Sequence, residues 1–261
     1  MTIRTFLAPE TSIWTFYDWI LKLKNEAYIE KTGGGDWYPP DVWSLTKKGF
    51  LACADDLGEL TEKRFKPHSV QHDAWVLAFH LGDFIHGIPE HAKICSEQQF
   101  RSFDYSLHPN WLPEDKTHVP DGFTRVKSGE KSLVYGIEVE LNAKPIDRYN
   151  EIFSYYDDES SIDFVLWLVG SEYVRTRLLD KLNVMDLLRK DMHNFISFDD
   201  FRKNGWKATV IQGRLKTNSM RSLMFPTSVL HRSYNGPTSV LQTPMQVFLN
   251  SGRSPRKLAL S

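Results

Sequence analysis

The sequence predicts an α/β fold in which a mixed β-sheet is flanked by helices. Residues 133–141 alternate in character, as expected of a strand with two different faces. Residues 162–169 form a continuous apolar run bounded by polar residues, which is typical of a central strand buried on both faces. Residues 146–156 carry an apolar stripe at helical spacing, which predicts a helix packed on the sheet, and residues 173–189 are expected to form the next helix.

The chain has 261 residues and a hydrophobic content of 41%, enough to bury a sizeable core. We expect two domains. The first apolar stretch is interrupted by charged residues, and no run approaches the roughly 20 apolar residues of a membrane span. We therefore expect a soluble, cytoplasmic protein without a membrane span. Cys53 and Cys95 are too few and too far apart for a disulfide framework or a zinc site, so we expect reduced, buried thiols and no redox chemistry.

The near-zero net charge hides an asymmetry along the chain. Residues 201–261 contain ten Lys or Arg and no Asp or Glu. Together with the Ser, Thr, Asn, Pro and Gly between them, these residues predict a basic, partly flexible C-terminal segment that could bind phosphates by displacing counterions. A solvated tail without a partner is the alternative.

The N-terminal part, residues 1–84, is expected to form a winged-helix-like DNA-binding region. Its expected elements follow the order helix, strand, Gly-rich turn, strand, helix, at residues 12–25, 27–30, 33–36, 42–45 and 46–55, with Ser12 and Thr46 as N-caps. This order resembles the second half of a winged helix, with the first helix as the recognition helix. Only about eleven residues precede that helix, so the module is expected to be truncated or to be completed by a partner subunit, such as the second chain of a homodimer. The alternative is a helical hairpin that packs on the second domain without touching DNA.

A further helix is expected over residues 68–86. His68 and His72 are four residues apart on it and could share a metal ion, but no third ligand with zinc-site spacing is near. We therefore interpret these histidines as packing or helix-terminal residues.

Two acidic side chains interrupt the strand at 133–141. The alternation places Tyr135, Ile137 and Val139 on one face, and Glu138 and Glu140 on the other. Carboxylates that share one side of an interior strand repel each other and are expensive to desolvate, so this arrangement favours a bound cation.

A third carboxylate, Asp121, precedes this strand across a polar turn at residues 127–131. If the two segments form a hairpin, Asp121, Glu138 and the backbone carbonyl of Val139 can converge on one ion. Mg²⁺ and Mn²⁺ accept such oxygen ligands, and either ion can neutralise a phosphate and activate a water molecule for phosphodiester hydrolysis.

Pro120-Asp121 and Glu138-Val139-Glu140 resemble the signature of the PD-(D/E)XK nuclease superfamily, which implies a restriction-endonuclease-like core over residues 85–200. Glu140 stands where the family usually has Lys. Some members carry Glu there, and this residue could bind a second ion or act as general base. Lys144, on the following turn, could take the lysine role, and Glu97 corresponds to an additional carboxylate that many of these enzymes supply from a preceding helix.

The order of these motifs further resembles the plasmid replication-relaxation proteins and the MobC-type mobilisation relaxases of conjugation. That resemblance spans roughly residues 12–180 and includes His72-Asp73 and Arg148-Tyr149. It implies nicking of DNA at a plasmid transfer-origin-like site by a metal-activated water, with an accessory mobilisation protein. A tyrosine nucleophile among Tyr149, Tyr155 and Tyr156 is a less favoured alternative.

We expect DNA contacts from polar and basic residues of the N-terminal helix, the helix after the strand, and the C-terminal segment. These residues are Thr15, Lys22, Lys24, Arg148, Arg214, Lys216 and Arg221. Two other functions remain open: a replication or transcription regulator whose nuclease fold binds DNA without cutting it, and a restriction-type endonuclease.

Overall fold

The structure is a computed structural model that describes residues 13–34, 41–57, 70–102 and 108–226. The described part is a mixed α/β protein with a two-stranded and a six-stranded sheet. The expectations for Ser12, for His68, for part of the Gly-rich turn and for the chain after residue 226 fall outside these ranges. No helix in the described ranges is long and apolar enough to cross a membrane.

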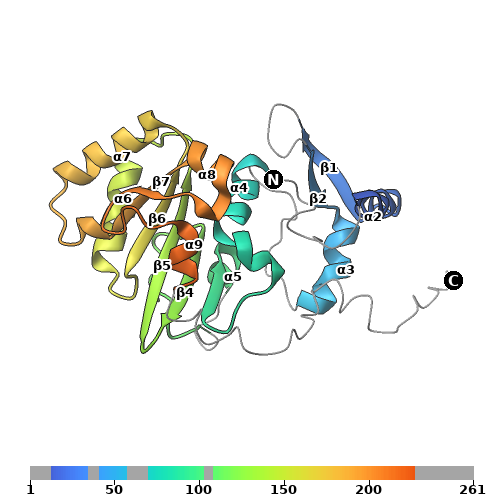
Figure 1. The fold of residues 1–261 in the computed structure, drawn as a ribbon, viewed down its shortest axis with the longest axis horizontal. Coiled ribbons are helices and arrows are strands. Elements are labelled where there is room, and N and C mark those ends of the chain that lie inside the picture. The colour runs from blue at the N-terminus through green and yellow to red at the C-terminus, as the bar shows by residue number, and fades with distance from the viewer. Residues whose placement is uncertain (1–12, 35–40, 58–69, 103–107, 227–261) are drawn as a thin grey trace.

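The N-terminal elements follow the expected order (Figure 1). They are α2 (Ile13–Asn25), β1 (Ile29–Gly34), β2 (Asp41–Leu45) and α3 (Lys47–Leu57). The two strands pair antiparallel. Thr46 caps α3 as expected, because its Oγ1 accepts the N–H of Gly49 at 3.1 Å and donates to Ala27 O at 2.6 Å. Whether this unit binds DNA remains a prediction.

The large sheet has the strand order β3-β4-β5-β6-β7-β8. Its strands are β3 (Ala92–Ser96), β4 (Gly122–Ser128), β5 (Lys131–Glu140), β6 (Phe164–Val169), β7 (His193–Ser197) and β8 (Val210–Gln212). β3, β4 and β5 are antiparallel neighbours, β5, β6 and β7 run parallel, and β8 is antiparallel to β7. The mixed sheet, the β4-β5 hairpin and the buried central position of β6 are as predicted.

Helices cover both faces of this sheet (Figure 1). One face packs against α6 (Ile146–Asp158) and α7 (Glu172–Val184), and α5 (Glu97–Ser102) adds Phe100 to the same core. The other face packs against α4 (Val70–His80), α8 (Phe198–Asn204) and α9 (Met220–Met224), together with the 3-10 turns Gly82–His86 and Gly205–Lys207. A third 3-10 turn, Lys190–Met192, leads into β7.

Two expected boundaries are displaced. Trp75 and Phe79 bury α4 against the sheet, so this helix belongs to the core domain although residues up to 84 were assigned to the N-terminal region. Residues 201–226 also belong to the core domain, because Trp206 and Met220 are buried there and β8 extends the sheet. Apolar residues spaced between the basic ones anchor this segment, which net charge alone suggested to be a tail.

The helix expected over residues 68–86 divides at Gly82. This residue has a positive φ of 33°, and an added Cβ would lie 1.8 Å from the indole nitrogen of Trp206. The chain therefore turns where the indole packs, and α4 ends at His80. Helix α7 likewise ends at Val184, short of the expected residue 189. Cys95 is a free, buried thiol as expected, whereas the side chain of Cys53 lies outside the described part.

Candidate metal and nucleic-acid site

The β4-β5 hairpin brings two of the predicted carboxylates close together. Gly122 pairs with Ile137, and the N–H of Asp121 donates to Ile137 O at 3.0 Å. Asp121 thus lies beside the β5 segment that carries Glu138, and the two carboxylates interact electrostatically. Only 15% of the Asp121 side chain and 4% of the Glu138 side chain are exposed. Like charges in this position oppose folding unless a cation or a hydrogen-bond donor compensates them.

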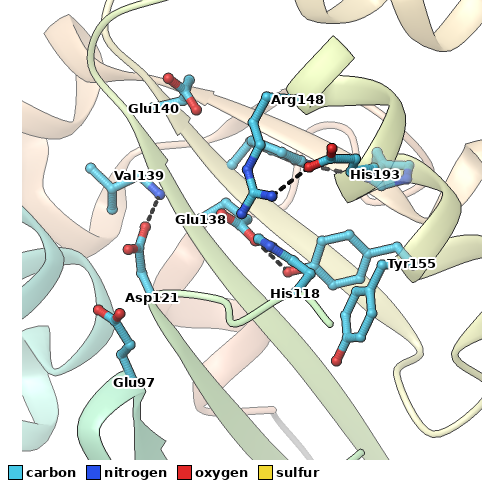
Figure 2. Close-up of polar contacts among 12 residues, drawn as sticks. Glu97, His118, Asp121, Glu138, Val139, Glu140, Arg148, Tyr155 and His193 are labelled. Atoms are coloured by element: carbon cyan, nitrogen blue, oxygen red, sulfur yellow. Dashed lines mark hydrogen bonds and ion pairs between the residues drawn. The ribbon is translucent and has the colours of Figure 1, made fainter. Parts of the chain in front are cut away.

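Asp121 lies immediately before β4, and its side chain forms a hydrogen bond with the backbone of the neighbouring strand β5. Its Oδ2 accepts the N–H of Val139 at 2.7 Å (Figure 2). Burial, and then the charge of Glu138, raise the pKa of the Asp121 carboxyl to about 7. His72 and the amide of Val139 oppose this effect without cancelling it. Asp121 is therefore a carboxylate whose negative charge is incompletely compensated.

The carbonyl of Val139 lies close to Asp121 at the start of β4. His72 approaches both from α4, with its Nε2 3.0 Å from Val139 O and 3.6 Å from Asp121 Oδ2. The Nδ1 of His72 lies 3.5 Å from Asp73 Oδ1. The hydrogen bond with Asp73 and the charge of Asp121 outweigh burial and raise the pKa of His72 to about 9. These surroundings therefore stabilise positive charge.

Glu138 is held from the opposite side. Its Oε1 accepts hydrogen bonds from His118 Nε2 and from the hydroxyl of Tyr156, both at 2.6 Å (Figure 2). Burial acts to raise the pKa of Glu138, but His118, Lys144 and Tyr156 together outweigh it and the pKa is lowered. Among the described residues, none donates a hydrogen bond to Glu138 Oε2. One oxygen is thus fixed while the other remains available to a ligand.

Glu140, two residues further along β5, is also buried, with 3% of the residue exposed. Lys144 Nζ lies 2.6 Å from its Oε2. Burial raises the pKa of Glu140, and Lys144 counteracts part of this effect. The ammonium of Lys144 also interacts electrostatically with Asp121 and Glu138. Lys144 thus contacts Glu140 directly and interacts electrostatically with the other two carboxylates.

The other predicted site residues lie apart from this cluster. Glu97, at the start of α5, pairs with Arg101 at 2.7 Å, and within the described ranges no ion pair or hydrogen bond joins it to the carboxylates. Arg148 is exposed on α6 and pairs with Glu151. Arg221 pairs with Asp83 at 2.9 Å. The remaining residues expected to contact DNA are exposed: Thr15, Lys22 and Lys24 on α2, and Arg214 and Lys216 between β8 and α9.

The three tyrosines near the cluster are not placed as nucleophiles. The Tyr149 hydroxyl accepts the N–H of Lys144 at 2.8 Å, and that of Tyr155 points to Asp115 O at 3.5 Å. Burial is the largest cause that raises the pKa of Tyr149, Tyr155 and Tyr156. Buried, protonated phenols attack a phosphate poorly, so the geometry argues against a covalent tyrosine intermediate.

Two histidines at the site were not assigned a functional role from the sequence. His72 was interpreted as a packing residue, and His118 received no role in the loop before Asp121. The pair His72-Asp73 carries a signal, since an acidic neighbour can fix the tautomer of a histidine. His118 carries no comparable signal, because only the fold brings it to Glu138.

Within the described ranges, no three His, Cys, Asp or Glu side chains are grouped so that they could hold a metal ion. Comparison of the chain with protein-family models, curated proteins and solved structures found no match.

Proposed function

We propose that this protein is a metal-dependent DNA endonuclease that nicks one strand, in the manner of plasmid mobilisation relaxases. The observation that carries the proposal is the cluster at the start of β4, where the mostly buried side chain of Asp121 and the buried side chain of Glu138 repel each other beside the carbonyl of Val139. Burying two acids close together is unfavourable for a purely structural role, whereas it suits a divalent cation.

The residues present fit Mg²⁺ or Mn²⁺. Asp121 and the Val139 carbonyl would hold the ion, and Glu138 would offer its Oε2 beside them. Such ions commonly bind one or two carboxylates together with water and substrate phosphate, so a third acidic side chain is not required. When bound, the ion would lower the pKa of a water molecule and neutralise charge on the phosphate.

The protein's own side chains would perform the remaining tasks. His118 and Tyr156 hold Glu138 in one orientation. Lys144, held by Glu140, places a positive charge near the carboxylates and could stabilise the negative charge that develops on a phosphate. The exposed Lys22 and Lys24 of α2 could bind the DNA backbone.

Incubation of the protein with supercoiled plasmid and Mn²⁺ or Mg²⁺ tests this function. Open-circular product is expected for a nickase. Linear product would indicate a restriction-type enzyme, and intact plasmid with retained DNA binding would indicate an inert nuclease fold.

Substitutions at the site test whether nicking depends on these residues. Asp121→Ala and Glu138→Ala should abolish nicking while DNA binding persists. Glu172→Gln, a change of an exposed carboxylate on α7, is the matched control and should nick like wild type. Wild-type rates in both site variants would disprove the assignment.

A further inference from the structure

The start of β4 carries an arrangement that the two carboxylates alone do not explain. The imidazole of His72 approaches it from α4, a helix on the face of the sheet opposite to α6. Its Nε2 lies 3.0 Å from the Val139 carbonyl and 3.6 Å from Asp121 Oδ2. Three potential donor atoms, from three segments of the chain, thus lie close to one another.

These separations suit ligands of one ion. A six-coordinate ion with bonds of about 2.1 Å holds neighbouring ligand atoms about 3 Å apart. The separation of 3.0 Å already agrees with this value, and the separation of 3.6 Å requires only a small side-chain movement. One of the three donors is a backbone carbonyl, so the arrangement is consistent with the absence of a group of three side chains in the described residues.

Asp73 supplies a second, independent feature. Its carboxylate faces His72 Nδ1 at 3.5 Å, on the side of the ring opposite to Asp121 and Val139. Histidines that bind metals usually donate their second ring N–H to a carboxylate or a carbonyl, which fixes the tautomer and leaves the other nitrogen as the ligand. In the absence of metal, Nε2 donates to Val139 O, and a metal ion would replace this proton while Nδ1–H continues to face Asp73.

We propose that His72 is a metal ligand, which together with Asp121 and the Val139 carbonyl forms a mixed nitrogen and oxygen site selective for Mn²⁺ over Mg²⁺. This inference rests on the proposed metal site and specifies its ligands. Imidazole suits transition metals, whereas Mg²⁺ prefers oxygen ligands and retains its waters. Asp73 is the positioning residue that orients the imidazole.

The chain offers a matched control for this role. His91 is half-buried, and its Nε2 lies 3.0 Å from a backbone carbonyl, that of Met224. This contact has the length of the contact between His72 and Val139, but no ion pair joins His91 to a carboxylate in the described structure. His91→Ala therefore controls for loss of an imidazole contact with the backbone.

The test is Mn²⁺ binding by the full chain without DNA, followed by electron paramagnetic resonance, with circular dichroism to verify folding. His72→Ala should weaken Mn²⁺ binding by about 10- to 100-fold and Mg²⁺ binding less, and Asp73→Asn should weaken Mn²⁺ binding by about tenfold. His91→Ala should bind as wild type does. Bound Mn²⁺ should also show a nitrogen hyperfine coupling that changes on ¹⁵N-histidine labelling and disappears in His72→Ala.

The outcomes separate this inference from the proposed function. If wild type binds Mn²⁺ and Asp121→Ala does not, while His72→Ala binds normally and the nitrogen coupling is absent, the metal site stands and His72 is not its ligand. If the wild-type protein binds neither ion, both proposals fail.

Discussion

The burial of Asp121 beside Glu138 predicts that this site opposes folding in the absence of metal. The pKa of Asp121 is about 7 instead of 3.8. At about 1.4 kcal/mol for each pH unit, the ionised carboxylate destabilises the fold by up to about 4 kcal/mol above pH 7. Asp121→Asn removes this charge, and its amide oxygen can still accept the N–H of Val139.

The sign of the pH dependence follows from the direction of the pKa change. Below pH 3.8 the carboxyl is protonated in both the folded and the unfolded chain, so wild type and Asp121→Asn should differ little. The difference grows as the pH rises, reaches roughly 2 kcal/mol at pH 5, and is complete above about pH 7. At about 2–4 °C per kcal/mol, the melting temperature at pH 8 should rise by up to roughly 8–16 °C.

Urea unfolding of both proteins in a chelator, at pH 5 and pH 8, measures this effect. Glu97→Gln is the control, because this carboxylate is partly exposed and pairs with Arg101 on its own helix. Its stability should change little at either pH. An Asp121→Asn variant that is no more stable than wild type at pH 8, or equally stabilised at both pH values, would refute the reasoning.

Four further outcomes are expected. Gly122→Ala would place a Cβ 2.2 Å from the His80 ring, so it should lower the free energy of urea unfolding by about 1–3 kcal/mol, and an unchanged value would contradict this packing. Burial lowers the pKa of His193 from 6.5 to about 3, so the folded protein keeps this histidine neutral while the unfolded chain protonates it below pH 6.5. The free energy of unfolding is therefore unaffected by His193 above pH 6.5 and decreases as the pH falls below that value. His193→Gln should therefore flatten the decline in unfolding free energy between pH 6 and pH 4 by up to about 1.4 kcal/mol per pH unit, and parallel urea titration profiles would argue against it. Lys144→Ala should slow plasmid nicking at least about tenfold and Lys144→Arg less, whereas equal rates would remove Lys144 from the mechanism. Tyr149→Phe should nick within about twofold of wild type, and loss of nicking in a folded variant would revive the tyrosine nucleophile.

The strands could be predicted because their patterns are local. Alternation in residues 133–141 assigned Ile137 and Val139 to one face, and both pack in the core beside α4. The surroundings of Glu138 and Glu140 were harder to predict. Two glutamates normally indicate an exposed face, yet here α6 covers that face and Tyr156 contacts Glu138. Burial on the second face depends on a helix that comes later in the chain, so periodicity within the strand cannot reveal it.

Long-range partners were missed for the same reason. His72 lies on a helix that the sequence assigned to the N-terminal region, and only its packing through Trp75 and Phe79 brings it to β5. His118 lies in a loop without periodicity. The carboxylates could be found because a strand pattern and a hairpin fix their relative positions. Their basic partners could not, because helix packing and loop conformation depend on tertiary contacts.

The basic partners of the three acidic side chains indicate which carboxylate would still need a cation. Glu138 has His118 at 2.6 Å, and Glu140 has Lys144 at 2.6 Å. Asp121 has the more distant His72, at 3.6 Å, and accepts the N–H of Val139. A network built solely for stability would be expected to compensate all three acids, yet burial raises the pKa of Glu140 and raises that of Asp121 to about 7. If a divalent ion binds next to Asp121, it should stabilise the fold in proportion to the logarithm of its concentration, and Asp121→Asn should lose that dependence.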